Sequence, residues 1–286
     1  MMKLKTVALF CISIALIQFA PSTALATNKL RVITYNTWGL PRPFLIGAGR
    51  FKKIAATIPK FFADIIGFQE TFTKYADVLQ KVPGYPYKAF GSGKIKGKKI
   101  LTSGLLLLSK YPIVETEYMV YSKCSGFDCF AAKGVLWAKV AVPGVGEVNV
   151  FTTHTNAGSN KKVKSFQLVE AQNFIQKHLE GRSTLFLGDF NLQPGSEDYN
   201  YVHYAMDFAD SLDLYLTDHP EYSQDPDVIY SYILAKHFFK RRLDYVWLKD
   251  IGSKSMHPVN YKVIFNNKNG KRLSDHLGVM VDLEFN

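Results

Sequence analysis

Short runs of apolar residues, each bounded by polar or turn-forming residues, recur along the chain and predict β-strands. Some of them, such as Leu105–Leu108, are almost wholly apolar, which is typical of strands buried on both faces. If every such run forms a strand, two sheets packed face to face are favoured. The runs are Leu30–Asn36, Ile65–Gln69, Leu105–Ser109, Val135–Val142, Val148–His154, Thr184–Asp189, Leu243–Leu248 and Val279–Phe285.

Helical spacing of apolar residues occurs between some of these runs. One helix is predicted over Lys161–Leu179, where apolar residues share one face and Gly181 follows as a C-terminal cap. A second helix is predicted to begin near Arg50 and to be ended or kinked by Pro59. Strands interleaved with helices predict a layered fold of the α/β class.

The first residues have the pattern of an export signal. A short basic start is followed by an apolar run over Thr6–Ala20, and Ala24-Leu25-Ala26 has the small-x-small pattern of a cleavage site. We therefore expect a signal peptide over residues 1–26, cleavage near Ala26 and a secreted chain, either periplasmic or extracellular. A membrane anchor is disfavoured, because Pro21 interrupts the apolar run before it reaches about 20 residues.

Composition narrows the class of protein but not its partner. With 47% hydrophobic and 21% charged residues, the chain is neither disordered nor fibrous. We find no internal repeat and no linker, so residues 27–286 are expected to form a single domain. The net charge of +11 favours anionic partners, such as nucleic acid, phospholipid surfaces or phosphorylated small molecules. Cys124 and Cys129 could close a small disulfide loop or remain free thiols, because spacing alone does not fix geometry.

Polar residues able to bind a metal or a phosphate stand where the predicted strands end. Layered α/β folds usually build their sites at such strand ends. Taken singly, an Asn, Glu or His at a strand end is most often a turn former or a solvated side chain. The ordered set is more informative than any of its members: Asn36, Glu70, His154, Asp189, Asn191, Asp244, Asp275 and His276.

That set, on this strand pattern, resembles the endonuclease/exonuclease/phosphatase superfamily of metal-dependent phosphoesterases. The resemblance implies a four-layer αββα sandwich of two packed mixed β-sheets flanked by helices, the DNase-like fold. It is carried by the motifs Tyr35-Asn36-Thr37-Trp38, Gly67-Phe68-Gln69-Glu70, Thr153-His154-Thr155, Gly188-Asp189-Phe190-Asn191, Arg242-Leu243-Asp244-Tyr245 and Ser274-Asp275-His276.

The resemblance also implies a divalent metal at one edge of the paired sheets. A hard cation such as Mg²⁺, or Mn²⁺, takes oxygen ligands and keeps several waters, so one or two carboxylates suffice. Glu70 is the best candidate ligand, helped by Asn36 or Asp275. The sequence offers no Cys/His cluster of the kind that holds zinc.

The chemistry implied is in-line attack of water on a phosphodiester. Asn191 and His154 would donate hydrogen bonds to the phosphoryl oxygens. His276 is the candidate general base, with its ring oriented by Asp244. Asp189 would position the water or assist the leaving group, and the division between acid and base stays open.

One internal segment bears on the substrate. In Cys124–Trp137, Asp128 precedes Lys133-Gly134-Val135 by five residues, which looks like a region of the neutral sphingomyelinases, including the bacterial sphingomyelinase C type. Thr153–Ala157 is similar to a second pattern of that family. The resemblance implies hydrolysis of sphingomyelin to ceramide and phosphocholine. The expected partner is sphingomyelin or another choline phospholipid at a membrane surface, and the chain is expected to be a monomer. Asp128 and Lys133 would form a switch beside the site, although a surface ion pair is the ordinary interpretation of such a pair.

One departure from that family, and several rival functions, remain. The stretch Tyr261–Arg272 has a polar and basic tip where many secreted bacterial sphingomyelinases carry an apolar hairpin. Two other segments, Gly39–Gly47 and the basic Gly91–Lys99, could meet a membrane instead. A secreted nuclease is the main alternative, since Lys161–Lys164 and Lys240–Arg242 could follow phosphates. A phosphoinositide phosphatase is another. A non-catalytic binding module is disfavoured, because the polar set is complete.

Overall fold

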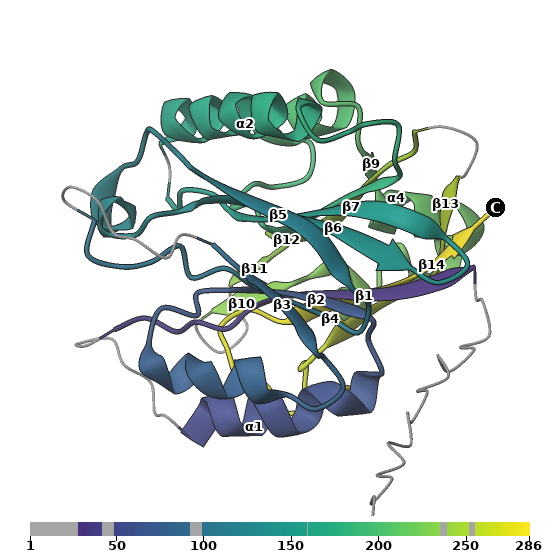
Figure 1. The fold of residues 1–286 in the computed structure, drawn as a ribbon, viewed down its shortest axis with the longest axis horizontal. Coiled ribbons are helices and arrows are strands. Elements are labelled where there is room, and N and C mark those ends of the chain that lie inside the picture. Colours follow the sequence, from purple (N-terminus) through teal and green to yellow (C-terminus); the bar gives the residue numbers. More distant parts are fainter. Residues whose placement is uncertain (1–27, 42–48, 92–98, 159, 235–238, 252–254) are drawn as a thin grey trace, which may run out of the picture.

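The structure is a computed structural model that describes residues 28–41, 49–91, 99–158, 160–234, 239–251 and 255–286. Two sheets pack face to face, with α1 (Gly49–Thr57) on the outer face of one and α2 (Lys161–Gln176) on the outer face of the other (Figure 1). The predicted four-layer αββα sandwich is therefore confirmed. The predicted signal peptide and most of the two predicted membrane-facing loops lie outside the described residues.

The first sheet carries the first two polar strand ends. Its strand order is β13 (Met256–Ile264), β14 (Gly278–Phe285), β1 (Lys29–Asn36), β2 (Ile65–Gln69), β4 (Leu106–Ser109) and β3 (Tyr87–Phe90). The central strands β1 and β2 are parallel, and Asn36 pairs with Gln69. Asn36 and Glu70 therefore reach the same edge of the sheet.

The second sheet brings three further residues to its own edge. Its order is β5 (Ile113–Val120), β6 (Gly134–Val142), β7 (Gly146–His154), β8 (Thr184–Asp189), β12 (Asp244–Lys249) and β9 (Ala209–Asp210). The parallel strands β7 and β8 pair His154 with Asp189, and the antiparallel strand β12 pairs Asp244 with Asp189. The register thus places these three side chains next to one another.

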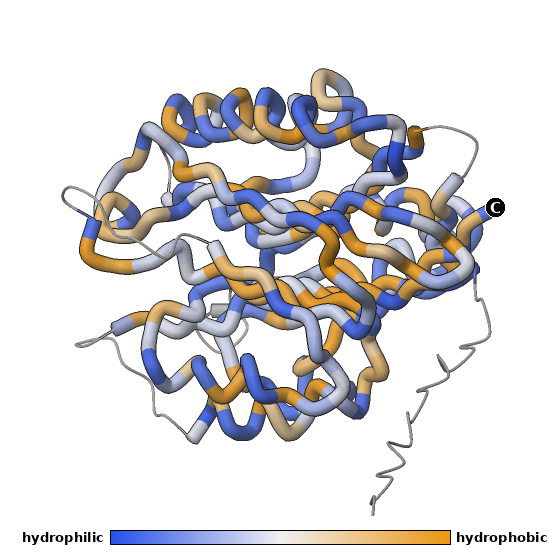
Figure 2. Tube along the Cα trace, viewed as in Figure 1, coloured by the Kyte–Doolittle hydropathy of each residue, from blue (hydrophilic) through white to orange (hydrophobic). Residues whose placement is uncertain are grey.

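Period-two alternation along the strands builds three apolar clusters. In β1, Leu30 and Val32 face the core between the sheets, whereas Ile33 and Tyr35 face the layer that contains α1. A third cluster, rich in aromatic residues, lies between the second sheet and α2. Figure 2 shows hydrophobic and hydrophilic positions alternating along both the strands and the helices. In the described ranges, no helix is both long and apolar enough to cross a membrane.

Short elements complete the fold. The strands β10 (Tyr232–Leu234) and β11 (Phe239–Arg241) form a small separate sheet. The remaining helical segments are η1 (Ile58–Phe61), η2 (Lys74–Lys81), η3 (Gly126–Phe130), α3 (Glu197–Asn200), η4 (Tyr201–Ala205), α4 (Ser211–Asp218), η5 (Pro220–Tyr222) and α5 (Pro226–Ile229).

All the predicted strands are present, and their bounds shift by at most two residues. The long helix ends at Gln176 and not at Leu179, because the chain enters a turn in which the His178 N–H binds the carbonyl of Ile175. Pro59 lies in the first turn of η1, directly after α1, as expected of a residue that cannot continue a helix. The pattern missed β3, β5 and β13, which occupy sheet edges and carry exposed polar residues.

Candidate active site

The polar strand ends meet in one cleft of 350 Å³. Asn36 and Asp244 lie beneath its lining and are hydrogen-bonded to it. The structure therefore gathers every predicted site residue in one place. The cleft is lined by Trp38, Leu40, Glu70, Phe127, Asp128, Lys133, His154, Ala157, Gly158, Asp189, Asn191, Tyr232, Arg241, Leu243, Asp275 and His276.

Close approach of the backbone at Gly188 brings two of these residues together. Gly188 has a φ of 146°, and a Cβ there would lie 2.1 Å from the carbonyl oxygen of Thr153. Only glycine allows β8 to come this near to β7. The following residue, Asp189, consequently has one carboxylate oxygen 3.3 Å from Nε2 of His154.

Three residues of the cleft have left-handed backbone conformations. Trp38, Glu70 and Asn191 have φ values of 52°, 57° and 49°. Such conformations cost free energy in non-glycine residues, and they persist where the surroundings hold them. Arg50 is one such support, because its guanidinium donates to the carbonyls of Thr37, of Trp38 at 2.7 Å and of Leu273 at 2.8 Å. It thereby ties the loop after β1 to the segment that precedes His276.

The carboxylate of Glu70 is buried and only half satisfied. Asn36 donates from Nδ2 to Oε1 of Glu70 at 3.0 Å and to Oδ2 of Asp189 at 2.9 Å, and its own oxygen accepts from the Trp38 N–H. No hydrogen-bond partner reaches Oε2 of Glu70 in the part of the chain that the structure describes. Burial raises the pKa of Glu70 to about 7, although the amide of Asn36 opposes the rise.

These observations fit a hard cation. A buried carboxylate oxygen without a donor is costly, and a divalent ion would satisfy it. Asp275 also lines the cleft, and burial raises the pKa of its carboxyl group as well. The side-chain oxygen of Asn36 already accepts a hydrogen bond, so the role of Asn36 as a metal ligand stays a prediction. Its side-chain nitrogen, in contrast, does bridge two carboxylates.

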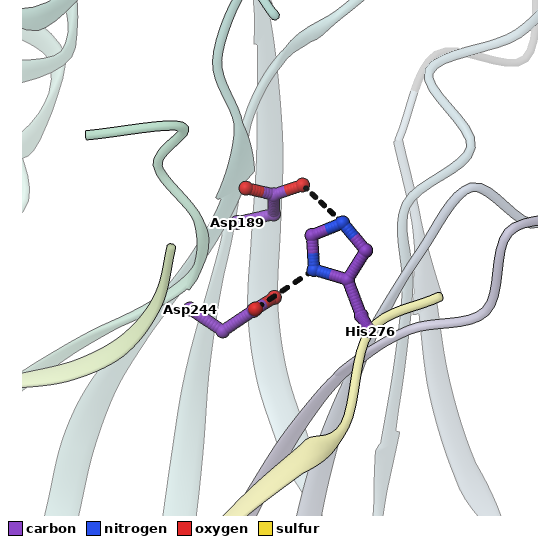
Figure 3. A group of neighbouring side chains, drawn as sticks. All are labelled: Asp189, Asp244 and His276. Atoms are coloured by element: carbon purple, nitrogen blue, oxygen red, sulfur yellow. Dashed lines mark hydrogen bonds and ion pairs between the residues drawn. The ribbon is translucent and has the colours of Figure 1, made fainter. Parts of the chain in front are cut away.

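His276 lies between two carboxylates (Figure 3). Its Nδ1 is 2.8 Å from Oδ2 of Asp244, and its Nε2 is 3.6 Å from Oδ2 of Asp189. Burial lowers the pKa of His276, but the charges of Asp244 and Asp189 outweigh burial and raise it to about 10. The ligand atoms of these three side chains lie within 4.8 Å of one another, a spacing that could also hold a metal. Two observations favour proton transfer over metal binding as the role of His276: its Nδ1 contacts a carboxylate, and hard cations prefer oxygen ligands. We therefore expect the cation at Glu70.

The ammonium group of Lys133 is buried and fully engaged. Its Nζ lies 2.8 Å from Oδ1 of Asp128, 2.9 Å from Nε2 of His154 and 3.0 Å from the carbonyl of Thr155. Three protons therefore meet three acceptors. Burial and the positive charges of Lys133 and His276 lower the pKa of His154 well below its usual value, so this ring is neutral. With Nε2 accepting from Lys133, the predicted donation by His154 to a phosphoryl oxygen requires Lys133 to move.

The turn that carries Asp128 is closed by a disulfide bond. Cys124 and Cys129 are joined with sulfur atoms 2.08 Å apart, which resolves the two alternatives for these residues. The backbone N–H of Ala157 also donates to the carboxylate of Asp128. The pair formed by Asp128 and Lys133 is thus part of the cleft wall and not an exposed surface pair.

Several residues of the cleft were not predicted. Tyr232 packs against His276 with ring centroids 4.8 Å apart, and its position depends on a β-bridge between these two residues. Nothing in the strand pattern signals that contact. Arg241 lies in the predicted nucleic-acid run Lys240–Arg242 and does reach the cleft. The interpretation of Arg242 was wrong, because it is buried and forms ion pairs with Asp210 and Asp213.

Comparison with known proteins supports the architecture. A model of the endonuclease/exonuclease/phosphatase family matches residues 33–276. A sphingomyelinase of Mycobacterium tuberculosis is 22% identical over 197 residues, which are 63% of this chain and 37% of that protein. A phospholipase C of Staphylococcus aureus is 28% identical over 207 residues, which are 64% of this chain and 60% of that protein. The chain spans about half the length of the curated relatives that it matches.

Solved structures share the fold. Sphingomyelinase C from Streptomyces griseocarneus superposes with a TM-score of 0.65 at 22% identity, covering 89% of this chain and 99% of that one. Beta toxin from Staphylococcus aureus with bound magnesium ions gives 0.64 at 19% identity, covering 88% and 99%. D. rerio TDP2 in complex with a single-strand DNA product gives 0.68 at 17% identity, covering 90% and 99%. Lipid-cleaving and DNA-processing proteins thus share this sandwich, so the fold alone does not choose the substrate.

Proposed function

Because the chain belongs to the endonuclease/exonuclease/phosphatase family, we propose that it is a metal-dependent phosphodiesterase that hydrolyses sphingomyelin to ceramide and phosphocholine. The observation that carries this proposal is the place of Lys133. Its ammonium group joins Asp128 to His154 at the wall of the catalytic cleft. The segment that resembles neutral sphingomyelinases is therefore built into the site and is not a separate surface feature.

The residues of the cleft can carry out the hydrolysis. Water attacks the phosphorus, a new phosphorus–oxygen bond forms, and the bond to the ceramide oxygen breaks. His276, oriented by Asp244, takes the proton of the water at Nε2. Burial raises the pKa of Asp189 to about 6, so its carboxyl group can hold a proton and donate it to the departing ceramide oxygen, while His276 keeps the proton taken from water. Asn191 donates its amide to a phosphoryl oxygen.

The divalent cation completes this set. Glu70, with Asp275, would hold it, and when bound it polarises the phosphoryl group and offsets negative charge in the transition state. The carboxylates beside His276 favour its protonated form. Protonation of Asp189 removes one of these two negative charges and so favours the neutral ring that the base role needs.

The cleft also suits a choline head group. Trp38, Phe127 and Tyr232 line it, and aromatic faces attract quaternary ammonium ions. A phosphocholine ester would thus meet aromatic rings at its cationic end and donors at its phosphate.

A nuclease is the second candidate function. Arg241 is exposed at the cleft, and Lys164 donates from Nζ to the carbonyl of Asn191 at 2.6 Å. Cations at this place could bind a second phosphate of a nucleic acid. The substrate, and not the reaction type, separates this candidate from the first.

A substrate panel with and without a chelator tests the proposal. Sphingomyelin vesicles, phosphatidylcholine vesicles, plasmid DNA and phosphoinositides are offered at equal phosphate concentration, and phosphocholine, nicked DNA and free phosphate are measured. The proposal predicts release of phosphocholine from sphingomyelin that stops with chelator and returns with Mg²⁺. DNA nicking without hydrolysis of lipid would reverse the order of the two candidates.

We propose in addition that residues 1–26 direct export. The basic start, apolar run and small residues before Thr27 support this. N-terminal sequencing of the chain secreted by an expressing bacterial host tests it. A mature chain that begins at Thr27 is expected, and a retained intact chain would contradict it.

A further inference from the structure

Two phenylalanines are exposed on one short turn. Phe127 and Phe130 belong to η3, 81% and 46% of their surfaces are exposed, and their ring centroids lie 6.4 Å apart. Ile100, which is 66% exposed, lies beside them, because its N–H donates to the carbonyl of Phe130 at 2.9 Å. We call residues 124–130 the aromatic turn. Together with Ile100 it forms a cluster of exposed apolar side chains.

The aromatic turn is fixed to the body of the protein. The disulfide bond between Cys124 and Cys129 closes it, and Asp128 anchors it to Lys133 and to the N–H of Ala157. At its start, the N–H of Ser125 donates to the side chain of Asn156 at 2.8 Å. The phenyl rings are therefore held outward before any partner arrives, which lowers the entropic cost of binding.

The aromatic turn also borders the catalytic cleft. Phe127 lines the cleft together with His154 and His276, and the segment after β1 adds Trp38 and Leu40. Apolar side chains from two separate segments thus accompany the polar residues of the site. A substrate that combines a polar head with hydrocarbon chains requires this combination at the place where it enters.

We propose that the aromatic turn, with Ile100, is the surface by which the chain contacts a choline-phospholipid bilayer. This inference rests on the proposed function, since a phosphodiester inside a bilayer can reach the cleft only if the mouth of the cleft meets the membrane. The exposed Lys123 next to the turn adds a positive charge that suits phosphate groups at the membrane surface. An aliphatic side chain beside the two rings matches lipid better than stacked nucleobases.

The turn between β13 and β14 does not offer such a surface. Phe265 is buried there, and the exposed residues Asn267 and Lys268 are polar. Phe265 instead stacks on Tyr35 with ring centroids 4.6 Å apart. Of these two described turns, the aromatic turn is therefore the one that offers apolar side chains to a membrane.

Vesicle binding without turnover tests this inference. The double variant Phe127→Ala/Phe130→Ala and the native chain are sedimented with sphingomyelin/phosphatidylcholine vesicles in the presence of chelator. Partition of the double variant is expected to fall by roughly tenfold or more, since two rings no longer enter the interface. Phe62→Ala is the matched control, because this ring is 71% exposed near the start of β2, at the far end of that strand from Glu70, and its partition should not change.

Unchanged partition of the double variant would overturn the inference, as would an equal loss in the control. With Phe127→Trp, vesicles should shift tryptophan emission to shorter wavelength, and an unshifted spectrum would contradict contact with the bilayer. Single-strand DNA is the comparison probe, and a greater loss of DNA binding than of vesicle binding would assign the turn to nucleic acid. Partition is also measured on pure phosphatidylcholine vesicles. A chain that binds membranes but does not cleave sphingomyelin would still partition onto them, so failure of this inference is distinguishable from failure of the proposed function.

Discussion

The floor of the cleft and the aromatic turn differ in how each is held together. The floor is linked by hydrogen bonds and ion pairs across both sheets, and it is buried except at Glu70, whose side chain is 13% exposed. It is made by Asn36, Glu70, His154, Asp189, Asp244 and His276. The aromatic turn exposes apolar rings and is held by one disulfide bond and by the anchored Asp128. The contrast indicates that the sandwich fixes the chemistry, whereas a loop between strands fixes access to the substrate.

Replacement of His276 should have the largest effect of all. His276→Ala removes the proton acceptor of the floor and is expected to lower turnover by roughly a thousandfold, within the range usual for general bases. Single-turnover rates on sphingomyelin measure it, with the melting temperature as a check of folding. His257→Ala removes a half-exposed histidine of β13 and should keep the native rate. Nearly native turnover of His276→Ala would remove this residue from the mechanism.

Glu70→Gln should come next, because the amide keeps the shape of the side chain but loses the charge that attracts a cation. We expect turnover to fall by roughly a hundredfold and the Mg²⁺ concentration for half activity to rise. In chelator, the melting temperature should rise, since a buried unpaired carboxylate oxygen is costly. Glu197→Gln is the control, because 90% of its side chain is exposed. An unchanged Mg²⁺ titration would place the cation elsewhere.

The pair of Asp128 and Lys133 joins the two regions and should have an intermediate effect. Lys133→Ala is expected to lower turnover on sphingomyelin by roughly tenfold to a hundredfold, because the partly buried carboxylate of Asp128 and the buried His154 lose their partner. A double-mutant cycle with Asp128→Ala measures the coupling. The two losses should be far from additive. Strict additivity would mean that the residues act independently.

Arg50 supports the floor from outside and should matter less. Arg50→Lys replaces a planar guanidinium, which donates from two separate nitrogen atoms to three carbonyl groups, by a single ammonium nitrogen, so turnover should fall by roughly fivefold to tenfold. If Arg50 positions the site, the loss should appear in kcat, with KM little changed. Lys52→Ala, an exposed change on the same helix, is the control. A loss confined to thermal stability would make Arg50 a structural residue only.

Opening the disulfide bond should have the smallest effect, and it separates the two regions most cleanly. Cys124→Ser/Cys129→Ser leaves the rings in place but frees the turn, so vesicle partition should weaken by roughly threefold. The ratio of turnover on vesicles to turnover on a soluble phosphodiester should fall by the same factor. A loss shared equally by both substrates would show that the bond supports the floor instead.

Much of the floor could be predicted from the sequence, because it stands at the ends of regular strands. The apolar runs located β1, β2, β7, β8 and β12. Parallel pairing of β1 with β2 and of β7 with β8, and antiparallel pairing of β12 with β8, then placed the polar residues together. Fold and family were confirmed by the architecture and by the matched family model.

The remaining parts of the site depend on contacts that periodicity does not encode. Tyr232 reaches His276 through one β-bridge, and Arg50 reaches its carbonyl partners from a helix. Arg242 carries the same charge as its neighbour Arg241, yet it is buried against Asp210. Phe127 is exposed because it lies in the short turn that the disulfide bond closes. The spacing of the two cysteines in the sequence did not predict whether that bond forms.

Hydrolysis of sphingomyelin in water enriched in ¹⁸O tests the central claim most directly. The floor residues are arranged for attack of water on phosphorus, so mass spectrometry should find the label in phosphocholine and none in ceramide. Label in ceramide, or no phosphocholine at all in the presence of Mg²⁺, would contradict the account.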